Sequence, residues 1–211
     1  MHASALFLPG FGAPVSLYEP GLPAHWRGLE PPSFAVSGGS LAAYRRWLGL
    51  ELRRRGRSSL GGHSMGAALA ILAAADAPEL VERLVLVAPA GLPLQKPISA
   101  SLGDFLRQLA DGLYPRVQAT SALAAVARAP RAALALAREV RRLDLRRECA
   151  AVRAAGIPAL VDGCSSDTLV TGAHAGTLAD ALGAEYRELG LAGGHMWMLG
   201  AHEALAGVLL R

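Results

Sequence analysis

The stretch RSSLGGHSMGAALAILAAAD, residues 57–76, decides the fold. Its first part, residues 57–62, predicts a strand, and residues 65–76, dominated by alanine and leucine, predict a helix. Between them stands Gly62-His63-Ser64-Met65-Gly66. A serine on so sharp a turn needs a strained backbone, and glycines two positions away on each side keep the turn free of clashes. A chance match in a chain rich in Gly and Ala is the alternative, and the strand-to-helix context argues against it.

Outward from this turn, strands and helices alternate along the chain. Residues 12–32, rich in Gly and Pro, are expected to be irregular. The apolar patterns predict strands at residues 4–8, 33–36, 57–62, 83–88, 157–161 and 185–189. They predict helices at residues 40–55, 65–76, 174–182 and 197–210. The alternation indicates an α/β fold: an about six-stranded, mostly parallel sheet with helices on both faces.

The domain organisation follows from length and from one long helical block. The 211 residues suit a single domain, 1–211. Residues 91–150 contain no good strand but carry apolar residues at helical spacing, and Pro115 and Pro130 divide them into two or three helices. We therefore expect a core of residues 1–90 and 151–211, interrupted by a helical insertion at 91–150.

The composition of the chain excludes several classes of protein. Hydrophobic residues make up 52% and charged residues 18%, which excludes a disordered polymer. The longest apolar run, Ala67 to Ala75, is far shorter than the ~20 residues that cross a bilayer. The N-terminus lacks the basic region of a secretory signal, and Cys149 and Cys164 are too few for a disulfide framework. We expect a cytoplasmic protein that does not bind membranes, metals or organic cofactors.

The net charge is +4, carried almost entirely by arginine. Two clusters stand out, at residues 53–57 and 138–147. They would suit a phosphate or nucleic-acid surface, but acidic residues such as Glu139 and Asp144 interleave with the second cluster and aromatic residues do not. Solvated helix faces explain the clusters better, and no nucleic-acid partner is expected.

A serine hydroxyl needs a base before it can attack a substrate. The best candidate is His195, which follows Gly193-Gly194 in a loop after the last predicted strand and can reach the carboxyl edge of the sheet. The remaining histidines are expected to be structural or solvent-facing: His2, His25, His63, His174 and His202. His63 in particular should point away from its neighbour Ser64 at a tight turn.

The base in turn needs an orienting carboxylate, and two aspartates follow the strand at 157–161. Asp162 stands at the strand end, and Asp167 lies further along the loop. We favour Asp167, because a loop position can reach across to His195, and Asp162 stays open as the alternative. The chain order serine, aspartate, histidine is the order that accompanies a serine on a strand-to-helix turn.

Two backbone amides are candidates for holding an oxyanion. The Met65 amide, at the start of the helix after Ser64, points where an oxyanion would form, with help from the helix dipole. The second donor should come from Pro9-Gly10-Phe11-Gly12, with the Phe11 amide as the candidate. An ordinary Gly/Pro turn explains that loop equally well from its own sequence.

These motifs together resemble the α/β-hydrolase superfamily over nearly the full length of the chain. The turn GHSMG, the loop LPGFG, the acid-to-histidine segment beginning at Asp167 and the helical block at 91–150 are similar to the family's elbow, oxyanion loop, C-terminal segment and cap. The resemblance implies Ser64 as nucleophile, Asp167 as acid, His195 as base, and Phe11 and Met65 as oxyanion donors. Three features depart from the family: we expect its two N-terminal strands to be missing from this sequence, Pro9 replaces the usual histidine, and one extra residue separates Gly163 from Asp167.

From these residues we expect two-step acyl transfer on a small or medium, largely apolar carboxylic ester. The side chains expected to contact the substrate are Leu92, Phe105, Leu106 and Trp197. Alternatives are an acyltransferase, a thioester or C–C hydrolase using the same three residues, and a ligand receptor that keeps the fold without turnover. The expected partner is a small-molecule substrate. A homodimer is compatible with the sequence, which does not set the oligomeric state.

Overall fold

The structure is a computed structural model that describes residues 4–94, 100, 103 and 116–211. The six strands are β1 (Ser4–Leu8), β2 (Trp26–Gly28), β3 (Ser58–His63), β4 (Val81–Val87), β5 (Ala159–Cys164) and β6 (Glu185–Leu189). They form one sheet in the order β2-β1-β3-β4-β5-β6, and every neighbouring pair is parallel. The expectation of a six-stranded parallel sheet is confirmed.

Helices alternate with these strands in the described chain. They are α1 (Phe34–Ser37), α2 (Leu41–Arg55), α3 (Met65–Asp76), α5 (Arg116–Arg128), α6 (Pro130–Arg141), α7 (Arg146–Ala154), α8 (Gly172–Leu182) and α9 (His202–Leu209). Short 3-10 helices occupy Val15–Leu17, Glu19–Gly21, Pro78–Leu80 and Gly194–Leu199. None of the helices within the described residues is long and apolar enough to cross a membrane.

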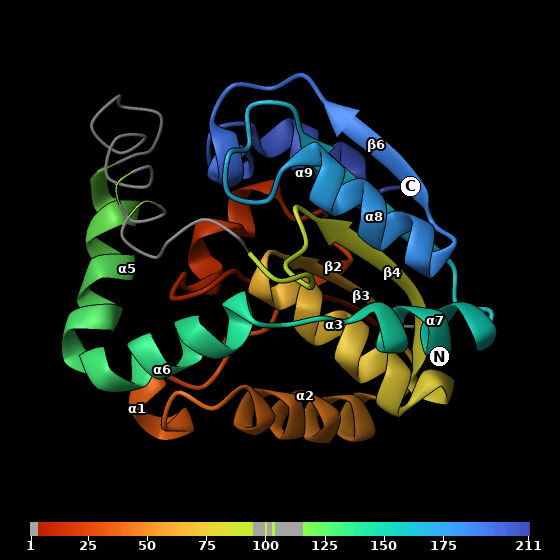
Figure 1. Cartoon of the computed structure of the whole chain (residues 1–211), viewed down its shortest axis with the longest axis horizontal. Coiled ribbons are helices and arrows are strands. Elements are labelled where there is room, and N and C mark those ends of the chain that lie inside the picture. The colour runs from red at the N-terminus through yellow and green to blue at the C-terminus, as the bar shows by residue number, and fades with distance from the viewer. Residues whose placement is uncertain (1–3, 95–99, 101–102, 104–115) are drawn as a thin grey trace.

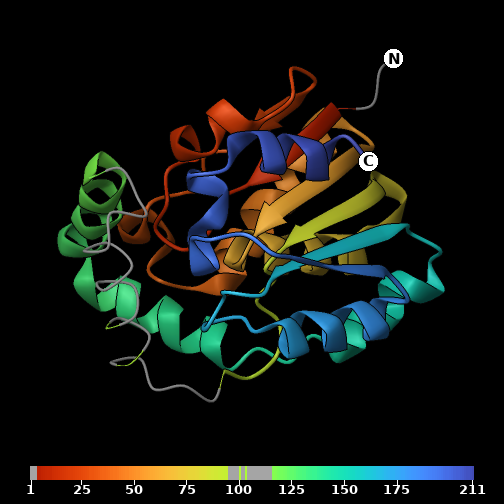
Figure 2. The same cartoon turned by 90° about the horizontal axis from the view of Figure 1, so that it is seen from above.

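Helices cover the sheet on both faces, as Figure 2 shows. The face that carries Leu6 and Leu8 packs under α2, α3, α7 and α8, whereas the opposite face, with Ala5 and Phe7, packs under α9. This division follows from the strand, where successive side chains point to opposite faces. Both views place α5 and α6 beyond the carboxyl ends of the strands (Figure 1).

α3 is the central helix of the larger layer. It contacts β1, β3 and β4, and its residues from Met65 to Ala74 are all buried. Alanine dominates the helix, and its small side chain lets the helix lie close to the sheet. A helix that is apolar all round belongs inside a protein, which explains the apolar run at 67–75 without a membrane.

The sequence analysis was wrong about the second strand. Residues 33–36 form no strand: the Ser33 hydroxyl accepts a hydrogen bond from the Val36 amide and caps α1, which ends at Gly38 with φ 61°. The second strand is instead β2, inside the stretch expected to be irregular, where Trp26 pairs with Ala5 and Gly28 with Phe7. With three residues, β2 is too short to show an alternating pattern.

The last predicted helix, at 197–210, is also corrected. Residues Gly194–Leu199 form a 3-10 helix with a kink at Met196, and α9 begins only at His202. In the block at 91–150 the structure describes α5, α6 and the first part of α7, with α6 starting at Pro130, whereas residues 91–94 and 142–145 lie outside helices. The predicted helical positions at residues 102–113 lie outside the described residues, apart from Gly103.

The turn between α1 and α2 offers a matched test of the packing against α6. Gly39 has φ 74°, and a Cβ there would stand 2.1 Å from the Ala132 carbonyl oxygen, whereas Gly38, with φ 61°, has open space around it. We expect Gly39→Ala to lower the free energy of unfolding by about 2–4 kcal/mol and Gly38→Ala by about 1 kcal/mol. Urea unfolding measures both, and equal losses would contradict this account of the turn.

Candidate active site

Ser64 occupies the strained turn that its sequence context predicts. It lies between β3 and α3 with φ 52° and ψ −114°, one of two described non-glycine residues with positive φ. A Cβ at Gly62 would stand 2.5 Å from the Gly66 carbonyl carbon, and a Cβ at Gly66 would stand 2.3 Å from the Leu8 carbonyl oxygen. Both glycines are therefore required by backbone contacts around the serine.

The structure brings Ser64, His195 and Asp167 into one line of hydrogen bonds. Ser64 Oγ lies 2.9 Å from His195 Nε2, and His195 Nδ1 lies 2.7 Å from Asp167 Oδ2. Since a carboxylate only accepts hydrogen bonds, Nδ1 carries the proton and Nε2 is left to accept the serine proton. This is the arrangement in which an imidazole acts as a general base on a hydroxyl.

The loop that carries His195 is shaped by glycines and tied to the acid loop. Gly193 and Gly194 have φ of 111° and 55°, and a Cβ at Gly193 would stand 2.8 Å from Trp197 Cα. The Ser166 hydroxyl accepts from the Gly194 amide at 3.0 Å and donates to the Leu191 carbonyl at 2.7 Å. One serine side chain thus holds the loops of Asp167 and His195 against each other.

Asp167 is buried but kept in its ionised form. Its second oxygen, Oδ1, accepts from the amides of Leu169 at 2.8 Å and Val170 at 2.9 Å. Burial alone would raise the pKa of Asp167, but the His195 ring and these two amides outweigh it and hold the pKa below its usual value. At neutral pH, Asp167 is therefore a negatively charged carboxylate beside the His195 ring.

Asp162, the alternative acid, has another partner. It is fully buried inside β5, and its carboxylate makes an ion pair with Arg187 at 2.7 Å. The two residues are cross-strand neighbours in the register of β5 and β6. The geometry favours Asp167 over Asp162 as the carboxylate that orients His195.

Two backbone amides, of Met65 and Phe11, are predicted to hold an oxyanion, and this role remains a prediction. Met65 is the first residue of α3, so its amide has no acceptor inside the helix. Phe11 is the second residue of a turn closed by the Ala13 amide and the Gly10 carbonyl at 3.2 Å, which leaves the Phe11 amide out of the closing bond. The Phe11 ring packs on Phe34, with centroids 4.9 Å apart.

His63 has a connecting role that the sequence analysis missed. It is buried, and its Nδ1 lies 2.8 Å from the Tyr18 hydroxyl while its Nε2 lies 2.9 Å from the His195 carbonyl oxygen. The carbonyl only accepts, so Nε2 donates to it and Nδ1 accepts from Tyr18. Tyr18 Oη accepts in turn from the Gly10 amide at 3.1 Å. The ring thereby links the loop after β1 to the backbone of the base.

Burial keeps this link neutral. It lowers the pKa of His63 to about 3, helped by the neighbouring His195, and it raises the pKa of Tyr18 above its usual range. Both groups therefore stay uncharged throughout the neutral range. Tyr18 lies in a Gly- and Pro-rich segment with no periodicity, so no sequence signal connected it to His63.

The side chains predicted to contact substrate fall into two groups. Leu92 is buried in the core on the α3 side, and Trp197 is buried on the α9 side. Neither lines the cavity described below, and their contacts with substrate remain predictions. Phe105 and Leu106 lie outside the described residues.

Comparisons with known proteins agree with this architecture. The model of the alpha/beta hydrolase family matches residues 2–208, so the chain belongs to that family of hydrolases. A search of curated protein sequences found no match.

Solved structures share the fold at low identity. An enol-lactonase from Burkholderia xenovorans LB400 has a TM-score of 0.77 and 22% identity, with 100% of this chain and 91% of that chain covered. An N-formylmaleamic acid deformylase from Pseudomonas putida has a TM-score of 0.74 and 17% identity, with 99% and 92% covered. A thioesterase domain from the curacin biosynthetic pathway has a TM-score of 0.65 and 19% identity, with 100% and 91% covered.

The two aspartates can be separated by substitution. Asp167→Asn should lower kcat for a p-nitrophenyl ester by about 10³–10⁴, because an amide at this position no longer stabilises the correct tautomer and charge of His195. Asp162→Asn should change kcat by less than about tenfold, since it alters only the pair with Arg187. A larger loss in Asp162→Asn than in Asp167→Asn would reverse the assignment.

The link through His63 predicts a loss in turnover from a residue distant in sequence. Tyr18→Phe removes the acceptor of the Gly10 amide and should lower kcat on the order of tenfold, below the ~10²–10³ of a lost oxyanion donor. KM should change less, and the acid limb of kcat/KM should still show one ionisation, because His63 stays neutral.

A matched control is Tyr186→Phe, which removes a hydroxyl from β6 at the opposite edge of the sheet from β2. It should leave kcat unchanged. If Tyr18→Phe lowers the unfolding free energy while kcat stays at the wild-type value, the link is structural only.

Proposed function

We propose that this hydrolase uses Ser64, His195 and Asp167 to cleave a carboxylic ester or related acyl compound through an acyl-enzyme. The observation that carries the proposal is the continuous line of short hydrogen bonds from the Ser64 hydroxyl through His195 to Asp167. Few structural arrangements of these three residue types serve a purpose other than nucleophile activation.

The first step transfers the acyl group to the enzyme. His195 Nε2 takes the proton of Ser64 as Oγ attacks the carbonyl carbon, and the carbonyl oxygen becomes an oxyanion beside the Met65 and Phe11 amides. His195 then gives this proton to the leaving oxygen, and the bond between the carbonyl carbon and that oxygen breaks.

The second step returns the enzyme to its starting state. Water gives a proton to His195 Nε2 and attacks the acyl carbon, and the same proton returns to Ser64 Oγ as the carboxylic acid leaves. Asp167 keeps its negative charge throughout and stabilises the imidazolium that forms twice in each cycle.

Other reactions fit the same residues. An acyltransferase would replace water by an alcohol or thiol, and product analysis with added acceptor separates it from a hydrolase. Thioesters and C–C bonds would be cleaved by the same acyl chemistry and are distinguished by a substrate panel. A ligand receptor would bind without turnover, and the direct contact between Ser64 and His195 favours catalysis over that role.

The test needs no knowledge of the natural substrate. A fluorophosphonate probe should label the wild-type protein, and mass mapping should find the adduct on Ser64, because the probe reacts with hydroxyls activated by a base. Ser64→Ala should abolish labelling and lower p-nitrophenyl butyrate turnover by at least about 10³.

Ser165→Ala, at an exposed serine next to Ser166, is the control for labelling at another hydroxyl, and it should leave an adduct on Ser64. Labelling at any other residue, or ester turnover that survives Ser64→Ala, would sink the proposal.

A further inference from the structure

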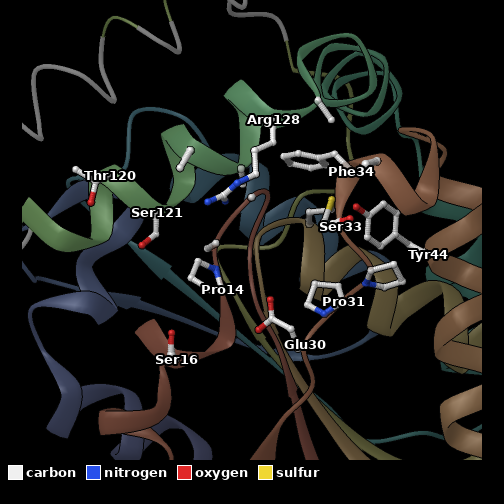
Figure 3. Close-up of a pocket in the computed structure, with 18 residues that line it drawn as sticks. Pro14, Ser16, Glu30, Pro31, Ser33, Phe34, Tyr44, Thr120, Ser121 and Arg128 are labelled. Carbon is white, nitrogen blue, oxygen red and sulfur yellow. The ribbon is translucent and has the colours of Figure 1, made fainter.

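A cavity of about 870 Å³ opens between Met65, the residue after Ser64, and the loop after β1. Its walls are the loop after β1, the segment at residues 30–35 and the part of α5 from Thr120 onward, and Met65 also lines it. Figure 3 shows these walls facing one another, with the side chains of α5 on one side and Pro14 and Glu30 on the other. Most of the lining is apolar, as in a pocket for a small molecule.

The position of this cavity indicates whether it accepts the leaving group or the acyl group of a substrate. It is lined by Gly12, next to Phe11, and by Met65, but by no residue of the loops that carry His195 and Asp167. A leaving group must lie within reach of His195, which protonates it. The cavity therefore lies on the other side of the reacting carbonyl, where the acyl group extends.

Two charged side chains line the described part of this cavity, Glu30 and Arg128. Glu30 has a structural partner, because its Oε2 accepts from the Val15 amide at 2.8 Å. Within residues 4–94 and 116–211, no hydrogen bond or ion pair engages the Arg128 guanidinium. Figure 3 shows this group extending from α5 into the space above Pro14.

An arginine in this position is suited to one kind of group. Its planar guanidinium offers paired donors that match a carboxylate, and because Arg128 is exposed, water partly screens that contact. A purely apolar acyl chain would leave the cation solvated by water alone, whereas a carboxylate would pair with it. Glu30, on the opposite wall, disfavours a second negative charge in the substrate.

We propose that the cavity binds an acyl chain that ends in a carboxylate, with Arg128 as the residue that recognises this end. The substrate class is then the ester, or the related acyl compound, of a dicarboxylic acid with one carboxyl group free. This inference rests on the proposed function for the location of the acyl group, and it refines the expectation of a largely apolar substrate.

The experiment compares two ligands that differ only in charge. Mono-p-nitrophenyl adipate carries a free carboxylate, and its terminal primary amide is the neutral analogue of the same shape. Adipate is preferred to succinate because the shorter half-esters hydrolyse by attack of their own carboxylate. The suberate pair tests a longer chain.

Binding is measured by calorimetry on the Ser64→Ala protein, which does not turn the esters over. The anionic ligand should bind about tenfold more tightly than its amide, as expected for one partly screened charge-assisted contact. When Arg128→Met is added to the Ser64→Ala protein, the two ligands should bind with equal affinity. With Arg128→Lys in its place, part of the preference for the anion should remain. Arg131→Met is the matched control, because Arg131 is an exposed arginine of α6 outside the cavity.

Turnover by the wild-type protein gives the second readout. The ratio of kcat/KM for the anionic and neutral esters should favour the anion and fall about tenfold in Arg128→Met but not in Arg131→Met. Turnover of the amide ester without any preference for the anion, or a preference that survives Arg128→Met, overturns this inference and leaves the proposed function standing. Anion-selective binding lost in Arg128→Met, without turnover of either ester, supports the binding site and overturns the proposed function.

Discussion

The strained backbone at Ser64 is the constraint on which both the fold and the site depend. A positive φ at a residue with a side chain costs on the order of 1–3 kcal/mol, so the surroundings must hold it. The Ser64 amide donates to the Val87 carbonyl at 3.0 Å, and the Ser64 carbonyl accepts from Ala68 and Ala90, both at 3.1 Å. The burial of α3 against the sheet offsets the strain, so the packing that stabilises the core also keeps the hydroxyl turned outward.

The same turn sets His63 in the interior. Its ring reaches Tyr18 on one side and the His195 carbonyl on the other, so three segments far apart in the chain meet at one imidazole. A Cβ at Gly10 would stand 2.7 Å from His63 Nδ1, which shows how closely the loop after β1 lies on this ring. The position of the loop after β1 is therefore coupled to the position of His195. This coupling runs through Tyr18 and His63 and is separate from the hydrogen bonds that join Ser64, His195 and Asp167.

The sequence predicted the parts of the molecule that depend on local patterns. Strands of five or more residues, the helix after Ser64 and the glycines around it follow from periodicity and turn chemistry. β2 was missed because three residues show no period, and Ser33 to Val36 was misassigned because one serine cap outweighed the propensity of Phe34 and Val36 for a strand. Contacts that depend on tertiary structure, such as Tyr18 with His63 or Arg128 with the cavity, leave no local signal.

The choice between Asp162 and Asp167 depends partly on local sequence and partly on tertiary structure. In the structure β5 extends to Cys164, beyond the predicted strand at 157–161, and its register with β6 sets Asp162 opposite Arg187, an ion pair that occupies the carboxylate. That register is fixed only when the sheet forms, so the sequence alone favoured Asp167 by reach and left Asp162 open.

Burial disfavours the charged forms of both ionisable groups that touch His195, which are His63 and Asp167. It lowers the pKa of His63 to about 3 and so keeps a second positive charge away from the base, whereas amides and the His195 ring keep Asp167 ionised in spite of its burial. When His195 takes up a proton, the imidazolium therefore faces one full negative charge and one neutral ring 4.7 Å away, centroid to centroid. If His63 were charged, it would oppose the protonation of His195, and much of the stabilisation that Asp167 provides would be cancelled.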